Sequence, residues 1–279
     1  MKVGVIMFCT GYSIGIVQLA KLAEQLGFES LFVPEHPAIP KDPATPFPSG
    51  GPIPRHYKET IDPYVGLAAA AAATTKLRLG TGISLIPQRN PLFTAKEIST
   101  LDLISNGRFE FGVGAGWLKE EVEMFGGDFA HRWAHTRDHV LAMKALWGPD
   151  PSEYHGKYAK FGPTHLFPKP IQKPHPPILI AGEGEHAAAR VAEYGDGWLP
   201  RGRNFTPQDV EAGRKKIEGL WKAKGRKGKF TISHFAAKPD KQSNRDFTNA
   251  GCDRILHMAP SEDEGKTKAL LEKWKAEVM

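Results

Sequence analysis

The feature that most constrains the fold is a regular alternation of short apolar strands with amphipathic helices, repeated eight times along the chain. Strands joined through helices lie parallel, because a parallel pair needs a crossover long enough to hold a helix. Eight such units in series favour a closed barrel, and 279 residues is a usual length for one. We therefore predict an α/β fold, a single (β/α)8 TIM barrel domain over residues 1–279. The expected strands span residues 3–8, 31–33, 77–83, 108–113, 178–180, 196–199, 230–235 and 254–258.

Helical spacing of apolar residues predicts the outer layer of this barrel. We expect Gly27 to end the first helix and Ser261 to cap the last one. Two segments rich in proline or glycine interrupt the pattern: residues 37–62 after the second strand and residues 154–177 in the fourth unit. Loops this long in a compact domain commonly form lids or ligand walls. The expected helices span residues 14–26, 63–75, 91–105, 117–125, 131–147, 185–194, 207–224, 245–250 and 261–278.

Composition argues against several classes of function. The two cysteines, Cys9 and Cys252, lack metal-ligand spacing, so we expect neither a disulfide nor a metal site. No apolar window approaches the roughly 20 residues of a membrane helix, and no signal peptide is recognisable, so we expect a cytoplasmic protein without a membrane partner. The net charge of +6 is dispersed except at residues 222–229. This pattern indicates a solvated helix end rather than nucleic-acid binding, and it is compatible with an anionic ligand.

Residues 107–117 are typical of a buried strand that ends in glycine-rich backbone and is followed by a helix. Glycine at a strand end lets a flat ring or a phosphate approach the main chain. A dinucleotide-binding motif is disfavoured, because the third glycine of GxGxxG falls at Trp117 and no acidic residue ends the next apolar strand. The segment therefore predicts a glycine-lined strand end that faces a cavity.

In a barrel of this kind, the reactive groups stand at the carboxyl ends of the strands. The residues expected there include one adjacent carboxylate and histidine, two glycine turns and two arginines. This set is suited to a large planar anionic cofactor rather than to hydrolysis by a metal or a nucleophilic serine. The positions are Phe8 and Cys9, Glu35 and His36, Ser84, residues 114–117, residues 182–184, and Pro200, Arg201 and Arg203.

At these residues the chain resembles the luciferase-like monooxygenase superfamily, in particular its branch of F420-dependent (deazaflavin) or flavin-dependent oxidoreductases. The resemblance covers almost the whole chain, and it rests on the order and spacing of several motifs. It implies a bacterial luciferase-type barrel, with long loops after strands 2 and 4. It also implies a strand-end bulge with a non-proline cis peptide behind the cofactor ring, at Gly82, Ile83 and Ser84. The motifs are residues 32–36, 79–91, 101–108, 112–117 and 194–198.

The resemblance also implies roles for the strand-end acid and base. His36 is similar to a histidine beside the reactive ring carbon in deazaflavin enzymes, where an imidazole moves a proton as a hydride moves. Its structural alternative is a loop histidine bonded to backbone. Glu35 is expected to orient His36 or to hold a cofactor ring, and its alternative is a salt bridge to a neighbouring strand.

Further residues are candidates for binding cofactor or substrate. Gly114 and Gly116 would let the cofactor approach the chain, and Trp117 would stack on a ring or belong to the core. Arg132 matches an arginine that binds ribityl or phosphate groups in relatives. The free amides around Gly182, Glu183 and Gly184 would receive a phosphate, or would simply begin a helix. Tyr57 and Arg201 are the expected substrate contacts, and the alternative for Tyr57 is an exposed lid.

The sequence thus predicts an oxidoreductase that transfers a hydride between coenzyme F420 and a small organic substrate at the C-terminal face of the barrel. The acidic tail of F420 suits the positive net charge. One alternative is a monooxygenase that uses reduced FMN and dioxygen. Another is a non-catalytic protein that binds a flavin or F420. The resemblance further implies a homodimer.

Overall fold

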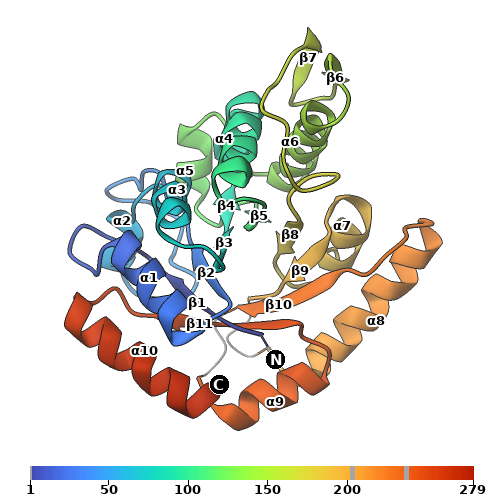
Figure 1. The fold of residues 1–279 in the computed structure, drawn as a ribbon. Coiled ribbons are helices and arrows are strands. Elements are labelled where there is room, and N and C mark those ends of the chain that lie inside the picture. The colour runs from blue at the N-terminus through green and yellow to red at the C-terminus, as the bar shows by residue number, and fades with distance from the viewer. Residues whose placement is uncertain (1, 202–204, 236–238) are drawn as a thin grey trace.

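The computed structural model describes residues 2–201, 205–235 and 239–279. Its strands form a closed parallel barrel of eight strand positions surrounded by helices, which confirms the predicted TIM barrel (Figure 1). One position is divided in two, because β4 continues the course of β3 after a short break. The strands are β1 (Lys2–Met7), β2 (Ser30–Val33), β3 (Arg78–Thr81), β4 (Ser84–Leu85), β5 (Phe109–Gly114), β8 (Ile178–Ala181), β9 (Gly197–Leu199), β10 (Thr231–Phe235) and β11 (Arg254–Ala259).

Strand pairing closes the barrel at two places. β1 pairs in parallel with both β2 and β11, so the first and last strands are neighbours. On the other side, β3 and β4 both pair with β5, through Leu79 opposite Phe109 and Ser84 opposite Val113. All eight predicted strands occur within one or two residues of the expected bounds, except that the third is broken at residues 82–83.

The helices cover the outside of the barrel (Figure 1). Asp62, Asn90, Thr206 and Asp240 each cap a helix by accepting backbone amide hydrogens. The predicted glycine end of the first helix is confirmed, since Gly27 has φ +88°. The helices are α1 (Ile16–Leu26), α2 (Arg55–Lys58), α3 (Pro63–Ala73), α4 (Pro91–Ile104), α5 (Lys119–Met124), α6 (Arg132–Trp147), α7 (Ala187–Tyr194), α8 (Pro207–Ala223), α9 (Lys241–Asn249) and α10 (Glu264–Val278), with a 3-10 turn η1 (Ile86–Gln88).

The predicted cap at Ser261 is wrong. The last helix begins later, and Asp263 caps it by accepting the backbone amide of Lys266. Ser261 instead donates its hydroxyl to the carbonyl of Phe8 at 2.6 Å. A serine two residues before the true cap gives a similar sequence signal, because both side chains are short hydrogen-bonding groups.

The barrel interior has an apolar layer above a charged layer. The apolar layer includes Ile6, Phe32 and Phe235. At the amino ends of the strands, Arg254 binds Glu110 through two hydrogen bonds of 2.7 and 2.8 Å, and it also binds Glu29. Burial alone would raise the pKa of Glu110, but Arg254 and Arg78 together lower it to about 2.

Two long excursions leave the barrel, as predicted. Residues 34–62 follow β2 and contain the short helix α2. After α6, the chain forms an antiparallel hairpin of β6 (Ser152–His155) and β7 (Lys160–Thr164), which projects away from the barrel (Figure 1). None of the described helices is long and apolar enough to cross a membrane.

Candidate functional site

Several of the predicted site residues lie along one rim of the barrel, in segments that follow the carboxyl ends of the strands. A series of contacts connects them although they are distant in sequence. Arg201 contacts Tyr57, whose ring lies 5.1 Å from that of His36. The His36 ring lies 6.1 Å from that of Trp117. The strand ends after β2, β5 and β9 therefore face one mouth, whereas Arg203 lies outside the described residues.

His36 follows β2 and is buried, and its partner is a residue that the sequence did not single out. Its Nδ1 lies 2.9 Å from Oε2 of Glu121 on α5, and the two side chains are 6% and 0% exposed. A carboxylate is a hydrogen-bond acceptor, so this contact places the imidazole hydrogen on Nδ1. Nε2 makes no hydrogen bond within the described part of the chain and is the nitrogen left for a ligand.

The expectation that Glu35 orients His36 is wrong. Glu35 accepts hydrogen bonds from the Ser84 hydroxyl at 2.8 Å and from the Leu85 amide at 2.6 Å. It also pairs with Arg89, whose pKa rises despite burial because of this carboxylate. Glu35 thus fastens the start of β4 through hydrogen bonds, and its salt bridge goes to Arg89 at the end of η1 rather than to a strand, as the alternative had expected.

Next to this anchor, the Gly82–Ile83 peptide is cis, as the resemblance implied. The bulge lies against Gly114, where an added Cβ would lie only 1.8 Å from Ile83 Cδ1. Gly114 is therefore needed to seat Ile83, rather than to open the main chain directly to a ligand. Ile83 is half-buried and packs on the apolar interior. Gly116 has φ +78°, the left-handed conformation that favours glycine.

Aromatic side chains close over His36. Tyr57, on α2, is buried, and its ring lies 4.5 Å from that of Phe8. Phe47, in the loop of residues 37–62, stands edge-on to Tyr57 at 5.2 Å and to Trp117 at 5.6 Å. The view of Tyr57 as part of an exposed lid is thus corrected. The loop of residues 37–62, hereafter the mouth loop, supplies a packed aromatic wall.

Arg201, after β9, joins two parts of the rim. Its Nη2 donates to the Tyr57 hydroxyl at 3.3 Å. Its backbone amide donates to Glu183. Burial raises the pKa of Glu183, although the nearby arginine opposes the shift. The Glu183 carboxylate is thus directed toward Arg201.

The second glycine turn adjoins an arginine pair. Gly182 and Gly184 have φ +101° and +86° just before α7. The indole of Trp133 lies near Gly182, and the Arg190 guanidinium stacks on that indole at 4.0 Å. Arg132 and Arg190 repel each other, and burial lowers the pKa of both. Within the described ranges neither has a carboxylate partner, and Nε of Arg132 is buried without a hydrogen bond.

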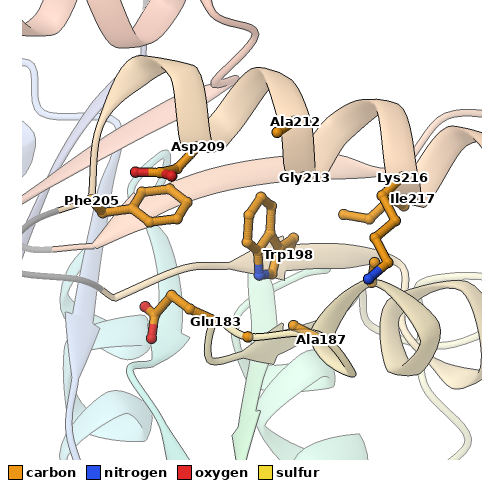
Figure 2. Close-up of a pocket in the computed structure, with 11 residues that line it drawn as sticks. Glu183, Ala187, Trp198, Phe205, Asp209, Ala212, Gly213, Lys216 and Ile217 are labelled. Atoms are coloured by element: carbon orange, nitrogen blue, oxygen red, sulfur yellow. The ribbon is translucent and has the colours of Figure 1, made fainter.

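A cavity of about 420 Å³ lies on the other side of this turn, between α7 and α8 (Figure 2). Trp198 forms its wall, and α8 approaches closely because a Cβ at Gly213 would lie 2.4 Å from the indole. The cavity is acidic near Glu183 and Asp209 and basic at Lys216 (Figure 2). It lies outside the barrel and does not cover His36. Periodicity could not reveal it, because it forms between two helices.

The described residues contain no group of three His, Cys, Asp or Glu side chains suited to a metal ion.

The sequence analysis did not identify three residues of the site, namely Glu121, Arg190 and Phe47. Glu121 stands among Glu120 and Glu123 on an apparently solvent-facing helix turn, and nothing in the sequence separates it from them.

Sequence comparisons place the chain among oxidoreductases. A family model for luciferase-like monooxygenases matches residues 14–246. An uncharacterized protein of Mycobacterium tuberculosis is 34% identical, with 100% of this chain and 99% of that protein aligned. The oxygenase component of a flavin-dependent trigonelline monooxygenase from Acinetobacter baylyi is 25% identical over 91% of this chain and 61% of its own length.

Solved structures show the same fold. A monooxygenase, RslO1 from Streptomyces bottropensis, has a TM-score of 0.78 at 22% identity, with 99% and 98% of the two chains covered. An F420-dependent secondary alcohol dehydrogenase, in complex with an F420-acetone adduct, has a TM-score of 0.73 at 19% identity and 98% coverage of both chains. Identities this low establish the fold only. The family match over most of the chain and the 34% identity to a full-length relative show that this barrel protein belongs to the luciferase-like monooxygenase family, whose members are oxidoreductases or monooxygenases.

Proposed function

We propose that the chain, as a single barrel domain, is an oxidoreductase that transfers a hydride between coenzyme F420 and a small organic substrate. The observation that carries this proposal is the buried His36 imidazole at the mouth, bonded through Nδ1 to Glu121. When a hydride joins or leaves a carbon that bears oxygen, a proton must join or leave the oxygen. His36 has its second nitrogen available for that proton.

The bound deazaflavin would supply or accept the hydride. The residues suited to its ring are the apolar floor at Ile83, the bulge from Gly82 to Ser84, and Trp117 at the side. Glu35 keeps the bulge in place through Ser84 and Leu85. The aromatic wall would exclude water from the reacting atoms. Tyr57 adjoins His36, and Arg201 bonds the Tyr57 hydroxyl; these two residues are the proposed substrate contacts.

The residues present fit an anionic cofactor at the second glycine turn. The guanidinium groups of Arg132 and Arg190 repel each other and have no carboxylate partner in the described residues; Arg132 donates from Nη1 to the Phe129 carbonyl, and its Nε is buried without a hydrogen bond. Trp133, which follows Arg132 in the chain and carries the Arg190 guanidinium on its ring, lies near Gly182, just before the positive end of α7. A phosphate there would relieve the repulsion between the arginines. Glu183, whose carboxylate turns to Arg201, would not oppose it.

The second candidate is a monooxygenase that uses reduced FMN and dioxygen. It is favoured by the similarity of the chain to the trigonelline monooxygenase, which is flavin-dependent. Both cofactors carry a flat tricyclic ring and a phosphate, so both suit the features above. The net charge of +6 favours F420, because its tail adds further acidic groups. A protein that binds either cofactor without turnover is the third outcome of the following test.

The test titrates purified protein with F420 and with FMN and follows ligand fluorescence. We expect tighter binding of F420, and at least a tenfold loss of affinity in Arg132→Ala and in Arg190→Ala. Arg137→Ala on α6 is the matched control, since Arg137 is already paired with Glu193. Preference for FMN would favour the monooxygenase, and binding of neither cofactor would refute the assignment.

A second arm separates enzyme from carrier. His36→Ala should keep cofactor affinity and lose about 100-fold or more in turnover, the usual contribution of a general acid or base.

We also propose that the protein is a cytoplasmic homodimer. Val65 on α3 and Phe93 on α4 are each 74% exposed, and two such apolar side chains on adjoining helices suit an interface. Light scattering of Phe93→Lys, expected to be monomeric, tests the dimer.

A further inference from the structure

We propose that Glu121 is the positioning residue that sets the tautomer of His36, and that Glu120, beside it, holds the mouth loop to the same helix turn. Helix α5 would thereby hold both the imidazole and the aromatic wall that covers it. The inference rests on the proposed function, in which His36 transfers a proton. The test below distinguishes a failure of this inference from a failure of the proposed function.

Within the described residues, the Glu121 carboxylate makes its hydrogen bond with His36 and with no other side chain. Its Oε2 bonds His36, and its Oε1 is buried without a hydrogen-bond partner in the described part of the chain. A buried carboxylate with an unsatisfied oxygen is costly, and an apolar side chain in its place would avoid that penalty. Its one bond goes to the imidazole, so the effect of the carboxylate falls on His36.

The surroundings of His36 leave this effect unopposed. Among the described residues, Tyr57 is the other titratable side chain with a ring contact to His36, and its hydroxyl is directed to Arg201. Glu35, its neighbour in sequence, is turned away toward Arg89. A neutral imidazole with its hydrogen held on Nδ1 presents a lone pair at Nε2, so it accepts a proton from a ligand. The protonated ring returns that proton from the same nitrogen.

Glu120 acts on the mouth loop. Its Oε1 accepts the backbone amides of Ala44 and Thr45 at 2.9 and 3.0 Å. Phe47 follows two residues later and packs on Trp117 and Tyr57, the two rings against His36. Adjacent glutamates on α5 therefore hold the aromatic wall and the imidazole that it covers.

The test uses four single variants in the full-length protein. Glu121→Leu removes the acceptor, whereas Glu121→Gln keeps an acceptor oxygen without the charge. Glu120→Ala releases the mouth loop. Glu123→Gln is the matched control, since Glu123 is exposed on the same helix and pairs with Lys119. Each variant is first checked for a cooperative thermal transition, and Glu121→Ala replaces Glu121→Leu if the leucine variant does not fold.

The first readout is nitrogen NMR of protein labelled at histidine, recorded without any cofactor. Signals of His36 are assigned by their absence in His36→Ala. We expect the Nδ1–H tautomer in wild type, Glu123→Gln, Glu120→Ala and Glu121→Gln, and a change toward the Nε2–H tautomer in Glu121→Leu. An unchanged tautomer in Glu121→Leu would overturn the proposal, whatever cofactor the protein binds.

The second readout is turnover with the cofactor and substrate that support it. Glu121→Leu should lower kcat by about tenfold or more with little change in KM, and Glu121→Gln should recover part of the loss. Glu120→Ala should instead raise KM severalfold. If Glu121→Leu turns over like Glu123→Gln, the positioning role is refuted. If neither the wild-type protein nor any variant turns over substrate, the proposed function fails. The NMR result still decides the role of Glu121 in that case.

Discussion

Replacing Glu110 with glutamine should remove the central charge of the ion network at the base of the barrel. Glu110 is buried between Arg254 and Arg78. These two guanidinium groups lower its pKa from the ordinary 4.5 to about 2. A carboxylate stabilised in this way stabilises the fold, because the unfolded chain lacks the same partners.

The size of the effect follows from the shift. The difference between 4.5 and about 2 is roughly 2.5 pH units, and each unit corresponds to ~1.4 kcal/mol, so the network contributes about 3.5 kcal/mol. Because the folded pKa is lowered, this stabilisation is fully present above pH 4.5 and is lost as the pH falls through about 2. Glutamine keeps the shape but not the charge, so Glu110→Gln should lose about 3.5 kcal/mol of stability at pH 7.

Urea unfolding followed by circular dichroism measures this loss. For a slope of about 3 kcal/mol per M, the midpoint at pH 7 should fall by about 1 M. The difference in stability between wild type and Glu110→Gln should shrink between about pH 4.5 and 2, as Glu110 becomes protonated in the folded protein. Glu59→Gln, which breaks an exposed pair with Arg55, is the control and should leave the midpoint unchanged. An equal midpoint for Glu110→Gln and wild type at pH 7 would refute the reasoning.

Two further predictions concern the bulge and its anchor. Gly114→Ala should lower the thermal midpoint and weaken cofactor binding, because the added Cβ would meet Ile83, and adding Ile83→Ala should restore part of both properties. Gly219→Ala, on the exposed side of α8, is the control. Its Cβ meets no atom within 4 Å, so this variant should instead stabilise the protein by about 1 kcal/mol. Arg89→Met should cost about 3 to 5 kcal/mol in denaturant unfolding, because it leaves the buried Glu35 carboxylate without its cation. A wild-type midpoint in Arg89→Met would show that Ser84 and Leu85 suffice for Glu35.

Most of the fold could be predicted because it depends on local patterns. Apolar runs predicted all eight strands, and helical spacing predicted the helices that cover them. The misses are places where the local signal is ambiguous. Ser261 and Asp263 are both good caps, and only the packing of Ser261 on Phe8 separates them. The hairpin of β6 and β7 was hidden in a proline-rich segment whose register depends on long-range contacts.

The candidate site was predicted in part. Strand-end placement correctly brought His36, Ser84, Trp117 and Arg201 to one rim, because parallel strands present their carboxyl ends at one edge. The pairing was not predictable, because the partner of His36 is 85 residues away on a helix whose three glutamates look alike in sequence. Glu35, the nearer carboxylate, was the natural choice and has a different task.

The order of strands and helices, the position of the glycine turns and the family resemblance follow from residues close together in the chain, so they could be predicted before folding was considered. Which charges meet could be learned from the folded barrel alone: Glu121 pairs with His36, Glu35 with Arg89, and Glu110 with Arg254. The physical reason is that a charged side chain has no periodic signature. The partner of a charged side chain depends on how the barrel closes and on the direction in which the backbone points the side chain. Both are defined only once the chain has folded.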